Sequence, residues 1–91
     1  QGKEIYYYKD KNGAEVDFVV KNGLKIEVLI QVCYDLSDSK KKSKELKSLL
    51  KAKKELRCEK TYVITWDYED EETFKDTKIH YIPLWKWFLH F

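Results

Sequence analysis

The sequence has few of the residues that build nucleotide loops, disulfide scaffolds or membrane spans. It contains three glycines, one proline, two cysteines and no methionine. No glycine begins a Gly-Lys-Ser/Thr motif, so this stretch carries no P-loop for a nucleotide. No apolar run approaches the roughly 20 residues of a membrane helix, and the first residues lack the pattern of a signal peptide. We therefore expect a cytoplasmic protein with no membrane partner.

The two cysteines, Cys33 and Cys58, are too few for a disulfide scaffold. A crossover helix predicted between them would place them at opposite ends of a sheet, too far apart for a bond. We expect both thiols to be reduced. His80 and His90 lack metal-ligand spacing with acids or cysteines.

The composition describes one small, charged domain. The 91 residues are 43% hydrophobic and 37% charged, and their net charge is only +2. Asn and Gln together number four, and abundant Lys and Glu with few amides is typical of heat-adapted proteins. Residues 1–91 are expected to form a single domain. The chain starts at Gln1 rather than Met, so we expect a fragment of a longer protein.

Alternation of apolar and polar residues predicts an α/β fold. Asn22-Gly23 is a strong hairpin signal, and a helix capped by Ser37 or Asp38 should run to about Leu56. Residues 67–76 are acidic and are predicted to be a loop. A short aromatic tail after Pro83 should form one or two helical turns. The predicted strands cover residues 5–9, 14–21, 24–34, 61–66 and 78–82, giving a mixed five-stranded sheet with one long crossover helix.

Two strands carry the positions that matter most for function. Asp17 lies on the second predicted strand, and Gln31-Val32-Cys33 lies on the third. These segments resemble the PD-(D/E)XK nuclease superfamily, which includes archaeal Holliday-junction resolvases. The similarity is greatest to the C-terminal domain of certain archaeal ATPases, over residues 29–35, 63–68 and 82–87. The resemblance implies a restriction-endonuclease-like core that lacks its first helix here, and it implies an ATPase as the parent protein.

The same resemblance implies a damaged catalytic site. Asp17 falls where such nucleases have a metal-binding aspartate, and Gln31 and Cys33 fall where they have Glu-x-Lys. An amide is a weak magnesium ligand, and a thiol cannot replace the lysine that handles protons. We therefore predict a non-catalytic module that needs no cofactor and serves nucleic-acid binding, interaction or regulation.

One alternative keeps catalysis. Asp17 and Glu27 could hold magnesium in an active endonuclease, although the residue two positions after Glu27 is Leu29 and not lysine. Strand register leaves this open: a strict two-residue turn would set Asp17 opposite Val28, and a bulge would set it opposite Glu27.

The predicted helix is strongly basic. Residues 40–57 include nine basic and two acidic side chains. Lys40, Lys44, Lys47 and Lys51 could contact DNA phosphates, or they could form an ordinary solvated face. The expected partners are thus DNA, the ATPase portion of the parent chain, or a second copy. A homodimer could form through an edge strand or through the tail residues Trp85, Trp87, Phe88 and Phe91.

Overall fold

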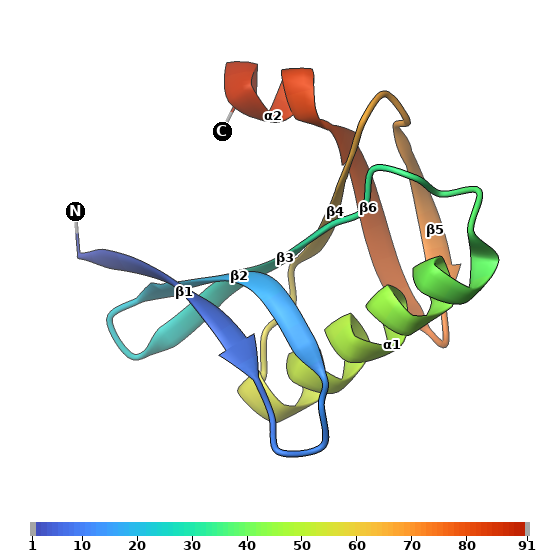
Figure 1. Cartoon of the computed structure of the whole chain (residues 1–91). Coiled ribbons are helices and arrows are strands. Elements are labelled where there is room, and N and C mark those ends of the chain that lie inside the picture. The colour runs from blue at the N-terminus through green and yellow to red at the C-terminus, as the bar shows by residue number, and fades with distance from the viewer. Residues whose placement is uncertain (1, 91) are drawn as a thin grey trace.

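The computed structural model describes residues 2–90 and shows a twisted mixed sheet between two helices (Figure 1). Phe91, which belongs to the predicted aromatic tail, lies outside the described residues. The elements in chain order are β1 (Lys3–Lys9), β2 (Glu15–Asn22), β3 (Lys25–Val32), α1 (Ser39–Leu56), β4 (Thr61–Thr65), β5 (Asp70–Phe74), β6 (Thr77–Pro83) and α2 (Leu84–His90).

The strands lie in the order β1-β2-β3-β4-β6-β5. The first three are antiparallel, β4 is parallel to both β3 and β6, and β5 is antiparallel to β6. The α/β class and the single long crossover helix are therefore confirmed. None of the helices among the described residues is long and apolar enough to cross a membrane.

The number of strands predicted from the sequence was wrong. The acidic stretch expected to be a loop contains β5, which forms a hairpin with β6 and occupies the sheet edge. Its turn residues Lys75 and Asp76 have φ angles of 49° and 67°. Two left-handed residues between paired strands make a primed turn, which suits the twist of a hairpin. The turn contains no glycine or asparagine, so the usual sequence signal is missing.

A β-bulge changes which residues of β2 face the core. Pairing moves from Tyr6–Val19 to Tyr8–Val16, so β2 advances three residues while β1 advances two. The extra residue brings Val16 and Val19 to the same interior, and both are fully buried. Strict alternation would put Phe18 on the same face as Val16, but Phe18 is 44% exposed. Asp17 lies within this bulge.

The hairpin between β2 and β3 settles the register. Asn22 pairs with Lys25, so the loop consists of Gly23, with φ of 65°, and Leu24. A further shift then pairs Val19 with Leu29, and both side chains have no exposed surface. Burial of this pair explains why the strands adopt neither of the two registers considered from the sequence.

Helix α1 packs on one face of the sheet through a stripe of small and branched side chains. Asp38 caps it by accepting a hydrogen bond from the Lys41 amide at 3.1 Å, and Arg57 ends it in the left-handed conformation. Leu46, Leu49 and Ala52 are buried, and α1 packs against β2 and β3. Cys33 and Cys58 are both free and buried, as the sequence predicted, because the crossover puts them at opposite ends of the sheet.

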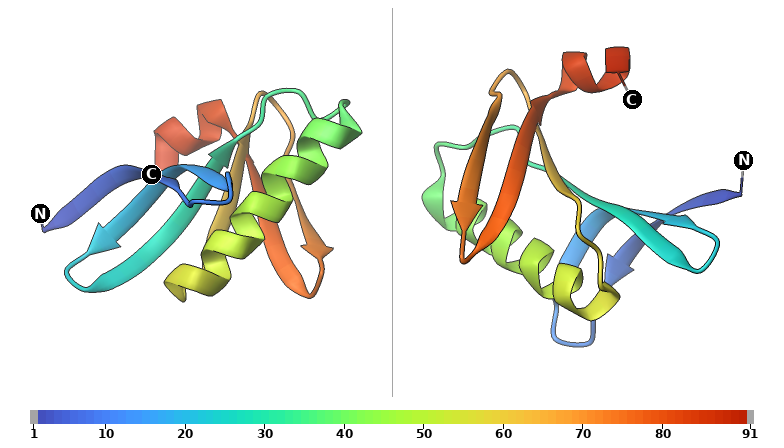
Figure 2. Two further views of the ribbon diagram at one scale, coloured as in Figure 1. Left: turned by 60° about the horizontal axis from the view of Figure 1, so that its bottom comes forward. Right: turned by 180° about the vertical axis from the view of Figure 1, so that it is seen from behind.

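The two helices lie on opposite faces of the sheet (Figure 2). Val63 belongs to the core under α1, whereas its neighbour Tyr62 contacts Trp87 of α2, with ring centroids 6.0 Å apart. Successive residues of a strand point to opposite faces, which is consistent with this arrangement. The molecule therefore presents two different surfaces, one formed by α1 and one by α2.

Candidate functional site

A basic groove lies between α1 and the turn that joins β1 to β2. It has a volume of about 640 Å³. All four lysines singled out from the sequence line it, together with three serines and three turn residues. The lining residues are Asn12, Gly13, Ala14, Ser39, Lys40, Ser43, Lys44, Lys47, Ser48 and Lys51.

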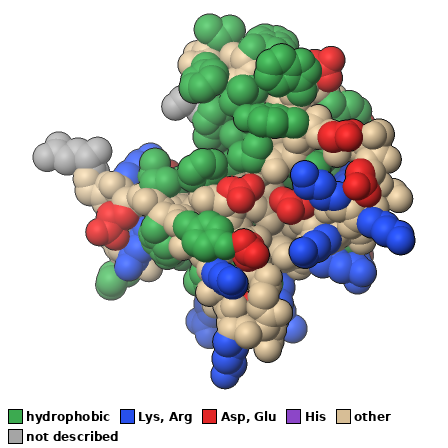
Figure 3. Space-filling view, viewed as in Figure 1, with side chains coloured by type: hydrophobic (Ala, Val, Ile, Leu, Met, Phe, Trp, Pro, Cys, Tyr) green, Lys and Arg blue, Asp and Glu red, His purple; other side chains and the backbone are tan. Residues whose placement is uncertain are grey.

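The spacing of the lysines explains why they share one groove. Lys40, Lys44, Lys47 and Lys51 are separated by four, three and four residues, which places them along one side of a helix. At 1.5 Å per residue they extend over roughly 16 Å. Figure 3 shows lysine and arginine side chains over α1, apart from the hydrophobic side chains over α2.

The other wall of the groove is held by Asp10. One carboxylate oxygen, Oδ1, accepts hydrogen bonds from the backbone amides of Asn12 and Ala14, at 2.9 and 2.8 Å. The other, Oδ2, lies 2.9 Å from Nζ of Lys51 on α1. The ammonium of Lys51 and the two amides lower the pKa of Asp10, so it stays charged and ties the turn to the helix.

Three lysines remain available to a ligand. Among the described residues, Lys40, Lys44 and Lys47 have no carboxylate within ion-pair distance, whereas Lys51 is held by Asp10. Lys40, Lys44 and Lys47 are all exposed. The groove therefore combines free positive charge with serine hydroxyls, which is the chemistry that recognises phosphate oxygens.

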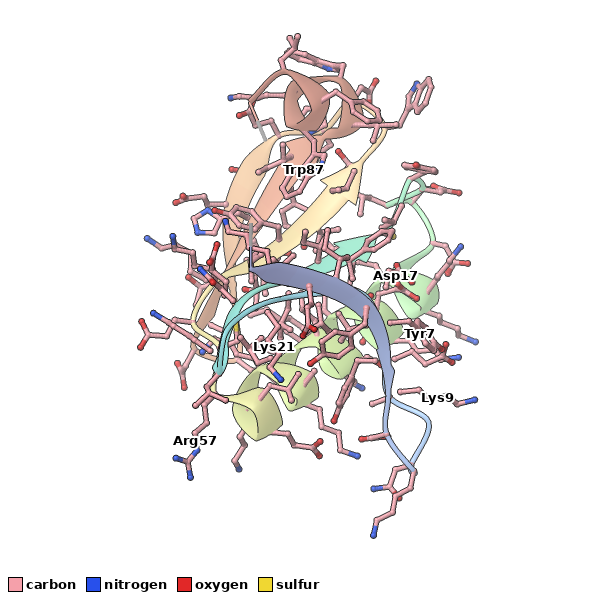
Figure 4. All side chains as sticks on the ribbon, turned by 90° about the vertical axis from the view of Figure 1, so that its left-hand side faces the viewer. Tyr7, Lys9, Asp17, Lys21, Arg57 and Trp87 are labelled. Atoms are coloured by element: carbon pink, nitrogen blue, oxygen red, sulfur yellow. The ribbon has the colours of Figure 1, made fainter. Side chains whose placement is uncertain are left out.

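Asp17 and Gln31 form a second feature, a bridge between β2 and β3. Regular pairing of these strands extends to Phe18–Ile30. Beyond that point the backbone amide of Asp17 donates to Oε1 of Gln31 at 2.9 Å, and the amide of Val32 donates to Oδ2 of Asp17 at 2.8 Å. Side chains thus link β2 and β3 beyond the last ladder pair. Figure 4 shows Asp17 near Tyr7 of the adjacent strand.

The amide group of Gln31 is fully occupied by the fold. Its nitrogen donates to the backbone carbonyl oxygens of Glu15, at 2.8 Å, and Glu45, at 3.2 Å. The side chain is 2% exposed. Because Oε1 already accepts from Asp17, Gln31 joins three segments and offers no open ligand oxygen toward solvent.

Cys33 lies in an environment that suppresses ionisation. Burial raises the pKa of its thiol, and the nearby carboxylate of Glu45 adds to this effect. Sγ donates to the backbone oxygen of Asp35 at 3.6 Å. A buried, protonated thiol cannot act as the proton-handling cation of a nuclease. The pKa of Glu45 is itself raised, first by burial and then by Asp17.

Glu27 does not join Asp17. It lies four residues before Gln31 on β3, a separation of roughly 13 Å along the strand. Its carboxylate accepts from Lys3 at 2.9 Å and from Asn22 at 3.1 Å, and Lys3 lowers its pKa. The structure therefore does not bring together the carboxylate pair of the alternative magnesium site. The described residues contain no group of three or more His, Cys, Asp or Glu side chains arranged to hold a metal ion.

The fold and the two features define a small α/β domain with a basic groove and an internal side-chain bridge. The chain belongs to the family described as Domain of unknown function (DUF4143), whose model matches residues 1–87. It is also 38% identical, over 95 aligned residues, to the uncharacterized protein MJ1544 of Methanocaldococcus jannaschii. That alignment covers 98% of this chain and 21% of the archaeal protein. No solved structure matches the chain.

Sequence reasoning missed the residues that support these features. Asp10 was assigned only to a turn, although an Asp three residues before Gly is a known signal for side-chain-stabilised turns. Glu45 contacts Gln31 through its backbone oxygen, which no side-chain pattern could reveal. The comparisons name a family without a stated function, so the nuclease resemblance stays a prediction.

Proposed function

We propose that this domain is a non-catalytic, nuclease-derived module that binds the phosphate backbone of nucleic acid through the groove on α1. The observation that carries the proposal is the convergence of Lys40, Lys44, Lys47 and Lys51 on one groove. A solvated helix face would have no other segment beside it. Here the β1–β2 turn forms the opposite side of the groove, and Asp10 holds that turn to the helix.

The chemistry of the groove favours a duplex backbone over single-stranded bases. Within the part of the chain that the structure describes, no aromatic side chain lines it, so it offers no platform on which bases could stack. The lysines extend over roughly 16 Å, which corresponds to about five base-pair steps of duplex. Serine hydroxyls and the Asn12 side chain can donate hydrogen bonds between the lysines. Contacts of this kind bind without reading sequence.

The proposal excludes cleavage for a structural reason. The positions that resemble a nuclease site are used for folding: Gln31 is committed to three hydrogen bonds, and Cys33 is buried and protonated. Asp17 is the remaining carboxylate, and one of its oxygens accepts from Val32. A single partly committed carboxylate is a poor basis for holding the magnesium that hydrolysis of a phosphodiester requires.

The proposal also includes a longer parent protein. The resemblance to the C-terminal domains of archaeal ATPases implies that the module would deliver an ATPase to nucleic acid. In support, the related archaeal protein is about five times as long as the matched region. The domain would then supply binding, and the chemistry would reside elsewhere in the polypeptide.

Fluorescence anisotropy with a labelled duplex tests the binding. Neutralising Z phosphates gives a slope of about −0.9Z in a plot of log affinity against log salt, so three free lysines predict a slope near −2.7. The double variant Lys44→Glu with Lys47→Glu should reduce this slope to about −1 and weaken binding at every salt concentration. The matched control, Lys25→Glu with Lys60→Glu, makes the same charge change outside the groove and should bind as the parent does.

Three results would reject the proposal. Equal losses of affinity in the groove variant and the control would show that only net charge matters. Cleavage of the duplex in magnesium or manganese, abolished by Asp17→Ala, would show an active nuclease. Absence of any binding would instead favour an interaction or regulatory domain.

A further inference from the structure

Helix α2 is apolar on both of its sides. Its sequence is Leu-Trp-Lys-Trp-Phe-Leu-His, with Lys86 as the one acidic or basic side chain before His90. Trp87 packs inward on Tyr62 of β4. Figure 4 shows Trp87 on the side of α2 that faces the sheet. Trp85, Phe88 and Leu89 follow the i, i+3, i+4 spacing of the opposite stripe and are 57%, 76% and 71% exposed. A helix that is hydrophobic all round is normally buried.

The exposed stripe continues onto the sheet. Trp66, directly after β4, is 64% exposed and meets Tyr34 edge to face, with ring centroids 6.1 Å apart. A hollow of about 330 Å³ separates Trp66 from α2 and is lined by Trp66, Asp67, Leu84, Trp85 and Phe88. Protruding rings and a hollow thus occur side by side in one patch, which we call the α2 patch (Tyr34, Trp66, Trp85, Phe88 and Leu89).

We infer that the α2 patch is the interface of a homodimer, in which each copy inserts its exposed rings into the hollow of the other. A two-fold interface uses the same surface on both copies, so that surface must contain both the protrusion and the cavity that receives it. The α2 patch meets this requirement. It also contains two tryptophans, and Trp and Tyr are the side chains that most often supply the binding energy of interfaces.

Size and charge agree with a second copy as the partner. The five large side chains of the patch are each more than half exposed and offer roughly 500–800 Å² of surface, which approaches the roughly 800 Å² per partner of a standard interface. A weak dimer whose population depends on protein concentration is therefore expected. Lys86 is paired with Glu69, and among the described residues that line the hollow Asp67 alone is charged, so little like-charge repulsion opposes self-association.

The test is the oligomeric state of this chain in solution without nucleic acid. Light scattering and sedimentation from about 1 to about 200 µM should show a monomer converting to a dimer. Trp85→Glu with Phe88→Glu should leave a monomer at the highest concentration, while circular dichroism stays that of the parent. Two control variants, Leu24→Glu on the β2–β3 loop and Ile5→Glu on the edge strand β1, should still dimerise.

Three outcomes would overturn the inference. A parent chain that is monomeric throughout the range would show that the α2 patch faces another polypeptide or solvent. Loss of the dimer in Ile5→Glu alone would place the contact at the edge of β1. Persistence of the dimer in the α2 variant would exclude the α2 patch. Because no nucleic acid is present, none of these results bears on binding in the lysine groove.

Discussion

Replacing Gln31 by glutamate would put a carboxylate where the nuclease resemblance expects one, and it should destabilise the fold. The side chain keeps its length, so Oε1 can still accept from the Asp17 amide. The second oxygen, however, would face the carbonyl oxygens of Glu15 and Glu45, to which the Gln31 amide now donates. Two hydrogen bonds would become two acceptor–acceptor contacts in a position that is 2% exposed.

The expected cost at pH 7 is about 3 kcal/mol. Leaving buried carbonyl oxygens without donors costs about 1–3 kcal/mol each, and burying an unpaired charge adds to this. For a chain of this size the change lowers Tm by roughly 15 °C. Burial and the carbonyl oxygens would raise the folded-state pKa of this glutamate above its unfolded value of about 4.3. The penalty is smallest below about pH 4, where the protonated carboxyl can donate to one of the two carbonyl oxygens and the other stays without a donor. It grows as pH rises through that range and is constant above the folded-state pKa.

Urea unfolding followed by tryptophan fluorescence measures this difference at pH 4 and pH 7, with each variant compared to the parent at the same pH. Gln31→Met is the matched control, because it removes the hydrogen bonds without adding a charge and should have a pH-independent cost. Equal stability of Gln31→Glu and the parent at pH 7 would refute the role assigned to the amide. Stabilisation of Gln31→Glu by excess magnesium would show that the position still faces a metal site.

Three further predictions concern the groove and the turns. Asp10→Asn should lower Tm at pH 7. The difference in Tm should shrink as pH falls through the lowered folded-state pKa of Asp10, because the parent then loses the same charge. Thermal melts in a series of buffers from pH 7 downward check this, and a difference that stays constant throughout would contradict it. Asp38→Ala should cost about 1 kcal/mol by removing the cap of α1, as measured by urea unfolding, whereas Asp38→Ser should restore most of it. Lys75→Asn with Asp76→Gly should stabilise the β5–β6 hairpin by about 0.5 kcal/mol, since both residues have positive φ; a fall in Tm would show that the native turn is not strained.

The regular parts of the fold were predictable from residue patterns. Helix α1 begins after Asp38 and ends at Leu56 as its cap and apolar spacing indicate, and β1 to β4 lie within a few residues of their predicted positions. The lysine spacing also predicted that Lys40, Lys44, Lys47 and Lys51 would lie on one face of α1. Each of these features depends on a local repeat that can be read from neighbouring residues.

The irregular parts were not predictable, because they depend on contacts between distant segments. The bulge at Asp17 exists because Val16 and Val19 both reach the core, which strict alternation does not allow. The turn at Lys75 and Asp76 uses residues that seldom take positive φ, so pairing with β6 must stabilise it. The bonds of Gln31 to two backbone carbonyl oxygens likewise appear only when β2 and α1 meet around it.

The placement of α1 and α2 on opposite faces of one sheet has a consequence for avidity. A dimer formed through α2 would leave both lysine grooves on the outside of the assembly, each pointing away from the interface. Two weak grooves on one rigid particle would engage one long duplex, or two duplexes at once, with the second contact made at high effective concentration. A duplex too short to reach both grooves would bind with the affinity of one groove. Affinity would therefore increase once the duplex is long enough to reach both grooves, which a monomer with one groove would not show.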